Sequence, residues 1–519
     1  MKTSKWVWAS VWIILAGIAM GLRFVAASRS TPLEGDAWHF VQNGVALAHG
    51  VPGAMSTYWS QGMIAIAAGS VKVGLDPRFT LQATTLISGV MVVLFFSAIV
   101  GLLAGNRWIA LISGLIFATN SPLVQYSVNG FSEMPYMMFL LGGVLVGLLK
   151  IPSPILKYGL AGALIGLGGY FKGLDAAVAA CGFGLYGFIC SAGGWLNKIK
   201  HGLIVPLVAF IVLIPLCAYT YSVSGSFTPG SKGKGNFTAG LLWADSKAVY
   251  SAEGHQWKDF SAEDIIRQIP TRIKQNIGDT FRLINSHVFM RGFRMGTIWF
   301  FLLVLFSIIL LWKHRVVCSL LPLFMITFQL AFLWIVFVHG RVLLPSLPWI
   351  ILLLVLGMSL LFGNTVSTPR KYVLGLIVTL FLLVNGVYSI DISSRDGFMK
   401  TVAHAQALRA LGGTDEDIVM AHGPAFAVEF NSTNPLKTVE IPYGSIEQVE
   451  EIAARKNVRF IVVSDTVRSH WPIARLFDKD IEAPSNWTLL KEFDYREELW
   501  PGGLKVGERQ RIYERIAVQ

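Results

Sequence analysis

The stretch PLEGDAWHFVQNGVALAHG, residues 32–50, decides the fold. It places Glu34 and Asp36 directly after the first long apolar run, so two carboxylates stand at the mouth of a predicted membrane span. Ionisable groups in such a position are costly and usually serve a function or an interface. After Asp36, apolar residues recur at helical spacing as far as Gly50. The pattern predicts an acidic hinge followed by a short helix on the membrane surface, with an ordinary polar loop as the alternative.

The composition indicates a polytopic membrane protein. The 519 residues are 54% hydrophobic and 14% charged, with a mean hydropathy of +0.57, which is too apolar for a soluble protein of this length. All four cysteines lie in apolar runs, so neither a disulfide framework nor a cysteine metal site is indicated. The net charge is +12. In a membrane protein, lysines and arginines usually lie in cytoplasmic loops and contact lipid headgroups, so membrane lipids and not nucleic acid are the expected partners.

Eleven apolar runs are long enough, or nearly so, to cross a membrane. The first has a basic start like a signal peptide, but it is long and many others follow, so we expect it to be retained. A single helix over residues 158–192 would measure about 50 Å against a hydrocarbon core of about 30 Å, so two spans with a turn near Lys172 are expected. The eleven runs are 7–27, 81–104, 108–124, 134–149, 158–171, 174–192, 202–222, 295–312, 316–338, 342–362 and 372–390.

The positions of the basic residues support about eleven spans with the N-terminus inside and the C-terminus outside. Alternation from a cytoplasmic N-terminus places most interhelical lysines and arginines inside, including Arg107, Lys150 and Lys200, as the positive-inside rule requires. Carboxylates and cations that are far apart in sequence then share the external face, which predicts a site there. The polar residues on that face are Glu34, Asp36, Asn129, Glu133, Lys172, Asp175, His339 and Arg341.

The external segment 223–293 divides into two parts. Its first part, GSFTPGSKGKGNFTAG, is glycine-rich but lacks the P-loop pattern, so we expect a flexible lid or loop. From Ser261 to Ile284, an isoleucine stripe opposes a row of arginines and lysines, with a predicted capping box at its start. This pattern is typical of a basic amphipathic helix that rests on anionic headgroups.

The last part of the chain reads as a small external α/β domain. Helices are predicted near 397–411 and 445–456, and strands near 417–421, 437–441, 458–463, 487–493 and 511–516. No nucleophile–base pair, metal-ligand spacing or glycine-rich fingerprint is evident in this sequence, which favours a supporting or acceptor-binding role. The predicted organisation is a membrane domain over residues 1–391, with external loops 28–80 and 223–293, followed by an external domain over residues 392–519.

Four stretches together resemble a known family. They are GDAWHFVQNGVALAHG after the first span, SEMPYMMFLLGG at the fourth, GLGGYFKGLDAAVAA between the fifth and sixth, and HGRVLLPSLPWIILLL at the tenth. In order, face and spacing they resemble the GT-C membrane glycosyltransferases, and within them the protein O-mannosyltransferases and the lipid A aminoarabinose transferase. Two positions depart from that pattern: Ala37 stands where a second carboxylate is frequent, and Val342 follows Arg341 where an aromatic–Arg–Tyr arrangement is common.

The resemblance implies an inverting transfer of a sugar from a polyprenyl-phosphate donor to a glycan, lipid or protein acceptor. It implies a site on the external face of a bacterial plasma membrane. Asp36 is expected to be the base, and Lys172 and Arg341 are expected to bind the departing phosphate. Glu133 and Glu34 are candidates to orient the acceptor or to hold a divalent metal ion, which GT-C enzymes use variably. No other cofactor is indicated.

Each of these residues has a structural alternative. Lys172 could pair with Asp175 in a turn, Arg341 could be an interfacial anchor, and Glu133 could simply be favoured by a helix dipole. His39 and His339 are expected to be hydrogen-bonded spectators rather than metal ligands. For the whole protein, a transporter or lipid flippase is the alternative, although internal repeats and mid-membrane charges are not evident. A non-catalytic scaffold would leave the loop carboxylates unexplained.

Overall fold

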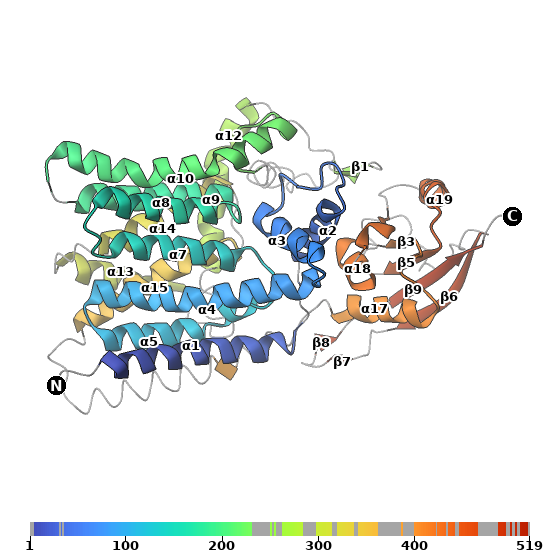
Figure 1. Ribbon diagram of the computed structural model, residues 1–519, viewed down its shortest axis with the longest axis horizontal. Coiled ribbons are helices and arrows are strands. Elements are labelled where there is room, and N and C mark those ends of the chain that lie inside the picture. The colour runs from blue at the N-terminus through green and yellow to red at the C-terminus, as the bar shows by residue number, and fades with distance from the viewer. Residues whose placement is uncertain are drawn as a thin grey trace.

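The computed structural model contains a bundle of helices and, at one end of it, a smaller part built around a sheet (Figure 1). The structure describes residues 5–30, 33, 36–191, 193–230, 250–251, 254–255, 262–283, 297–313, 319–336, 341–361, 386–387, 399–421, 423–431, 434–441, 446–464, 486–494, 499–500, 504–505 and 509–516. The predicted fold class, a helical bundle with a small C-terminal α/β part, is confirmed at this level.

The bundle consists of helices that run along the long axis of the molecule (Figure 1). Among the described residues, three of them, α4, α9 and α10, are long and apolar enough to cross a membrane by length and composition. The number of spans and their orientation therefore stay predictions. The helices are α1 (Lys5–Ala27), α4 (Pro77–Ala104), α5 (Arg107–Ala118), α6 (Ser121–Tyr126), α7 (Glu133–Leu148), α8 (Pro154–Gly168), α9 (Gly173–Cys190), α10 (Trp195–Ser224), α13 (Thr297–Lys313), α14 (Leu320–Val336) and α15 (Leu347–Leu361), which follows the 3-10 turn η4 (Leu344–Ser346).

Most predicted spans contain one described helix, and the expected turn between α8 and α9 is present. The candidate span over residues 108–124 contains two helices, α5 and α6, and not one. Helix α5 ends at Ala118, and the Asn120 side chain accepts a hydrogen bond from the Leu123 amide at 3.2 Å to cap α6. Pro122 lacks the amide hydrogen that a continuous helix needs, so the Asn–Ser–Pro sequence starts a new helix. The run 372–390 lies outside the described residues, apart from 386–387.

Two glycines of α8 allow its backbone to contact α10 directly. A Cβ atom on Gly162 would lie 2.6 Å from the Val205 carbonyl oxygen, and one on Gly166 would lie 2.9 Å from the Ala209 carbonyl oxygen. Membrane helices use small residues in this way because close backbone approach maximises van der Waals contact. The packing fixes the end of α8, and with it the turn that carries Lys172.

Helices α2 (Ala37–Ala48) and α3 (Gln61–Lys72) form a separate layer at the end of the bundle (Figure 1). The predicted helix after Asp36 is confirmed, whereas α3 was not predicted. Trp38 and Phe40 of α2 are buried in a cluster with Met63 of α3 and Val428 of the C-terminal part. Burial of side chains this large contributes about 1.5–3 kcal/mol each. Protein covers this apolar face of α2, so the face does not rest on lipid. The predicted position of the helix at the membrane surface stays a prediction.

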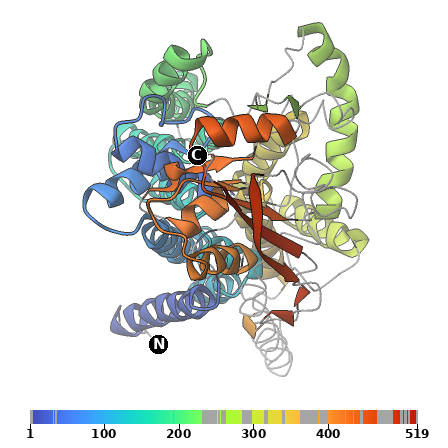
Figure 2. The same ribbon diagram turned by 90° about the vertical axis from the view of Figure 1, so that its right-hand side faces the viewer.

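The C-terminal part, which faces the viewer in Figure 2, holds a five-stranded sheet in the order β4-β3-β5-β9-β6. Strands β3, β4 and β5 are mutually parallel, while β9 pairs antiparallel with β5 and β6. The predicted strands and helices are confirmed, whereas α18 and the hairpin β7–β8 were not predicted. The elements are α17 (Met399–Ala410), β3 (Val419–Ala421), α18 (Gly423–Phe430), η5 (Pro435–Lys437), β4 (Thr438–Glu440), α19 (Ile446–Arg455), β5 (Phe460–Ser464), β6 (Trp487–Asp494), β7 (Leu499–Trp500), β8 (Leu504–Lys505) and β9 (Arg509–Arg515).

Strand β5 shows how the sheet is covered on both faces. Phe460 and Val462 point to the cluster formed with α17 and α18, while Ile461 and Val463 point to the cluster formed with α19. This two-residue alternation is the pattern from which the strand was predicted. The predicted domain boundary at 391/392 lies outside the described residues and stays a prediction.

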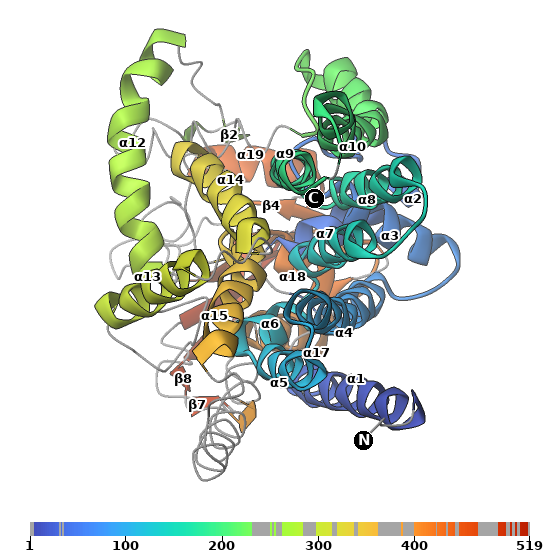
Figure 3. The ribbon, with the colours of Figure 1, turned by 90° about the vertical axis from the view of Figure 1, so that its left-hand side faces the viewer.

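The predicted amphipathic helix is present as α12 (Ala262–Leu283), at the outer edge of the bundle in Figure 3. The Asn276 side chain donates to the Trp334 carbonyl oxygen at 2.8 Å, and the Trp334 indole donates to the Thr280 hydroxyl at 3.0 Å. This helix therefore packs on α14 in addition to any contact with headgroups. The described part of the preceding loop includes the short hairpin β1 (Tyr250–Ser251) and β2 (Gly254–His255). The capping residue Ser261 and the lysine-containing part of the glycine-rich stretch lie outside the described residues.

Candidate functional site

Four of the residues predicted for the site meet at the end of the bundle nearest the C-terminal part. Asp36 precedes α2, Glu133 begins α7, Lys172 precedes α9 and Arg341 precedes η4. Arg341 Nη2 lies 2.5 Å from Asp36 Oδ2, and Arg341 Nε lies 3.1 Å from Glu133 Oε1. Lys172 Nζ lies 3.2 Å from the same Glu133 oxygen. These contacts form a row, Asp36–Arg341–Glu133–Lys172, which we call the ion row. Glu34 lies outside the described residues.

The ion row is more buried at Glu133 than at Asp36. The Glu133 side chain is 2% exposed and that of Lys172 is 12% exposed, whereas those of Asp36 and Arg341 are 22% and 20% exposed. A buried carboxylate is tolerated when cations and hydrogen bonds compensate its lost hydration, and two cations contact Glu133. Asp36 therefore stands at the open end of a charge-balanced group.

Arg341 contacts an aromatic ring in addition to the two carboxylates. Its guanidinium lies over the Phe131 ring, 4.8 Å from the ring centroid, in a cation–π contact. Burial alone lowers the pKa of this guanidinium, but the charges of Glu133 and Asp36 outweigh burial and raise its pKa overall. Arg341 is thus a fixed cation that can meet an anion at this end of the bundle.

Two of the three structural alternatives do not match this geometry. Lys172 pairs with Glu133 rather than with its sequence neighbour Asp175 as the turn alternative proposed. Arg341 is mostly buried between carboxylates, which does not suit an interfacial anchor. Glu133 does begin a helix, so the dipole favours its charge as the alternative held, and the two cations add to that effect. The catalytic roles of these residues stay predictions.

The loop before α3 adds Tyr58 and Trp59, which the sequence interpretation missed. Burial raises the pKa of Tyr58, the charge of nearby Asp36 raises it further, and Arg341 opposes the shift. The phenol is therefore a neutral hydrogen-bonding group beside the ion row. His39 stacks on Trp59 with the ring centroids 4.2 Å apart, which fits the predicted spectator role. The Tyr–Trp pair in the predicted external loop 28–80 was the sequence signal that could have identified these two residues. His339 lies outside the described residues.

The segment before Glu133 is tied to the bundle by buried hydrogen bonds. Arg23 is fully buried, and its Nε donates to the Ser127 hydroxyl at 3.0 Å. The Gln82 side chain donates to the Val128 carbonyl oxygen at 3.0 Å. These contacts fix the loop that leads to Phe131 and Glu133, so two elements remote in sequence support the ion row.

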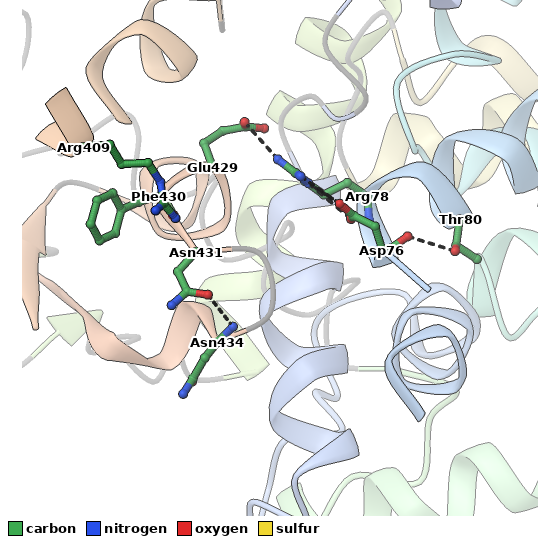
Figure 4. A network of polar contacts seen from close by, with 8 residues as sticks. All are labelled: Asp76, Arg78, Thr80, Arg409, Glu429, Phe430, Asn431 and Asn434. Carbon is green, nitrogen blue, oxygen red and sulfur yellow. Dashed lines mark hydrogen bonds and ion pairs between the residues drawn. The ribbon is translucent and has the colours of Figure 1, made fainter. Parts of the chain in front are cut away.

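The C-terminal part docks on the helix that follows Asp36. Its helix α18 packs against α2, and Val428 enters the α2–α3 cluster. At the edge of this contact, Arg78 lies 2.7 Å from Asp76 and 3.2 Å from Glu429, as Figure 4 shows. The Glu429 side chain is only 7% exposed. The C-terminal part, which was predicted to support the site, therefore contacts α2, the helix directly after Asp36 at the open end of the ion row.

A divalent metal ion does not fit the described residues as they stand. Among them, no group of three or more histidines, cysteines, aspartates and glutamates lies close enough to hold a metal. Asp36 and Glu133 are joined through Arg341, whose guanidinium occupies the space between the two carboxylates. The metal role considered for Glu133 would require Arg341 to move away from that carboxylate.

No protein-family model matches this chain, and no curated protein matches it in sequence. Solved structures do match its fold. ArnT from Cupriavidus metallidurans bound to undecaprenyl phosphate is similar with a TM-score of 0.56 at 11% identity, over 99% of both chains. The oligosaccharyltransferase of Archaeoglobus fulgidus, in complex with Zn and sulfate, has a TM-score of 0.55 at 11% identity, over 90% of this chain and 71% of that one. Both are GT-C glycosyltransferases. Structural similarity at 11% identity shows that this chain shares their fold.

Proposed function

We propose, from the GT-C fold of this chain, that it transfers a sugar from a polyprenyl-phosphate donor to an acceptor hydroxyl on the external face of a membrane, with inversion. The ion row is the observation that carries the proposal, because it joins a candidate base to two candidate phosphate-binding cations. The structural neighbour bound to undecaprenyl phosphate supports a polyprenyl-phosphate donor. Glycans, lipids and proteins are the acceptor classes, and a bacterial plasma membrane is the proposed location.

Asp36 is the proposed general base. It lies at the open end of the ion row, where an acceptor hydroxyl can approach from the side of α2 and the Tyr58 loop. A carboxylate engaged by a guanidinium takes up a proton less readily, so Asp36 has to be released from Arg341 before it acts. The neutral Tyr58 phenol is suited to hydrogen-bond the same acceptor.

Arg341 and Lys172 are the proposed donor-phosphate ligands. Guanidinium groups bind phosphate through two parallel hydrogen bonds, so a donor phosphate competes with Asp36 for Arg341. Binding of the donor would thereby free the base, and Glu133 would keep both cations in place. As the phosphate departs it gains negative charge, which fixed cations in a water-poor site stabilise strongly.

The proposed reaction balances without a further co-reactant. The acceptor hydroxyl loses its proton to Asp36 while its oxygen forms a bond to the anomeric carbon. The bond from that carbon to the phosphate oxygen breaks, and the polyprenyl phosphate leaves with the electron pair. Attack opposite the leaving group inverts the anomeric carbon.

Transfer from radiolabelled polyprenyl-phosphate sugars to a panel of acceptors, with the purified full chain in lipid nanodiscs, tests this function. We expect label to move to one acceptor class, with the product of opposite anomeric configuration. Transport of a labelled lipid or sugar across vesicles without any transfer would favour a transporter instead. The external location is tested with cysteine-free protein carrying His49→Cys or Lys200→Cys: an impermeant thiol reagent added outside should label only the first.

A further inference from the structure

A cavity of about 510 Å³ lies at the other end of the bundle from the ion row. Its walls come from the N-terminal half of α1, the first turn of α5 and the C-terminal turns of α4 and α7, whose ends meet away from the C-terminal part in Figure 1. The lining is formed mainly by apolar side chains, including Leu15, Leu102, Leu111, Leu145 and Leu149. The polar Ser97 in the wall donates its hydroxyl to the Ala110 carbonyl oxygen at 2.7 Å. Most of the wall therefore offers contact to hydrocarbon.

One charged side chain, Arg107, also lines this cavity. It is the first residue of α5, directly after Asn106, whose side chain accepts a hydrogen bond from the Trp108 amide at 2.9 Å. Trp108 is 62% exposed, and tryptophan is enriched where a membrane meets water. The cavity thus combines an apolar wall with a cation, and an exposed tryptophan follows that cation in the sequence.

The predicted orientation puts Arg107 on the cytoplasmic face, with Lys150 next to the lining residue Leu149. Basic pockets between membrane helices on that face suit the headgroups of anionic lipids. A soluble anion could bind Arg107 but would make no contact with the leucine wall. An uncharged acyl chain would fill the wall but would place no anion beside the Arg107 guanidinium. A molecule with both parts matches both features.

We propose that this cavity binds an anionic phospholipid, with its phosphate on Arg107 and part of an acyl chain against the leucines of α1, α4, α5 and α7. The site is distinct from the ion row and does not depend on sugar transfer. The lipid would lie between α1, α4, α5 and α7, and α7 carries Glu133 of the ion row at its other end. A lipid bound there would stabilise the bundle from the opposite leaflet.

Native mass spectrometry of the delipidated full chain, titrated with phosphatidylglycerol or phosphatidylcholine, tests the proposal. Wild-type protein should bind one phosphatidylglycerol more tightly than phosphatidylcholine. Arg107→Gln should weaken phosphatidylglycerol binding by about fivefold, the effect of one cation near a membrane surface. Lys200→Gln, which removes an exposed cation from α10, is the matched control and should leave binding unchanged.

Ala98→Phe, which fills the cavity without changing charge, should reduce the binding of both lipids. Thermal melting of each variant confirms that it is folded. Glycerol 3-phosphate should not compete, since it lacks the acyl chain. Equal affinity for the two lipids, unchanged phosphatidylglycerol binding in both folded variants, or displacement by glycerol 3-phosphate would overturn the proposal.

Discussion

The ion row and the surface of the C-terminal sheet hold similar ion pairs in opposite surroundings. Glu133 in the row is 2% exposed and contacts two cations. In the sheet, Arg459 also contacts two carboxylates, Asp417 and Glu514, but its side chain is 45% exposed. Water screens the second group, so it contributes little to stability, whereas the first keeps its charges close at a cost in hydration. Costly ionisable groups in membrane proteins commonly mark functional sites, which supports the function proposed for the ion row.

The largest expected effect is that of Arg341→Ala, which removes the cation joining Asp36 to Glu133. Breaking a buried pair costs about 3 kcal/mol or more, so the free energy of unfolding should fall by that order and donor use should be lost. Arg459→Ala is the matched variant in the sheet and should cost less than about 1 kcal/mol with transfer unchanged. Detergent-titration unfolding and the transfer assay measure both. Equal losses of stability in the two variants would contradict the proposed difference between the buried ion row and the exposed ion pairs of the sheet.

Lys172→Met comes next, because it removes the charge at the donor end and keeps most of the aliphatic stem. Loss of one charge-assisted contact of about 1.5–3 kcal/mol should weaken the apparent affinity for the donor by about tenfold or more. Lys437→Met is its control, since Lys437 pairs with the 88% exposed Glu416 in the C-terminal part. Donor titrations compare the two. An unchanged donor affinity in Lys172→Met would show that this lysine only neutralises Glu133.

A smaller effect is expected for Glu429→Gln at the contact between the two parts. Glutamine keeps an oxygen that can accept from Arg78, and Arg78 keeps its contact with Asp76, so we expect a loss of about 1–2 kcal/mol. Turnover should fall a few-fold, because α18 supports the helix that follows Asp36. Glu416→Gln on the exposed surface should change neither quantity. A larger effect from Glu416→Gln would contradict a role for the contact with α2.

Much of the C-terminal fold could be predicted because its signals are local. The alternation that places Phe460 and Val462 on one face and Ile461 and Val463 on the other is visible in the sequence. The grouping of Asp36, Glu133, Lys172 and Arg341 at one end of the bundle was also predictable, because the positive-inside rule assigned them to one membrane face. The fold-level match to GT-C structures agrees with the motifs that hold these residues.

The pairing within the site could not be predicted, because packing decides it. Asp175 is closer to Lys172 in sequence, but the glycine-mediated packing of α8 and the position of α7 bring Glu133 to the lysine instead. The helix α3 and the docking of α18 on α2 were also missed. A helix whose apolar face is covered by a distant segment looks in sequence like one that faces a membrane.

The most direct test of the central claim compares Asp36→Asn with Glu34→Gln in the transfer assay. Asparagine keeps the shape of Asp36 and its capacity for hydrogen bonds but cannot accept the proton. Transfer should therefore fall by about 100-fold or more, while donor binding and folding persist. Glu34→Gln removes a neighbouring charge of the same loop and should cost much less. Substantial transfer by Asp36→Asn, or a greater loss in Glu34→Gln, would contradict the assignment of Asp36 as the base.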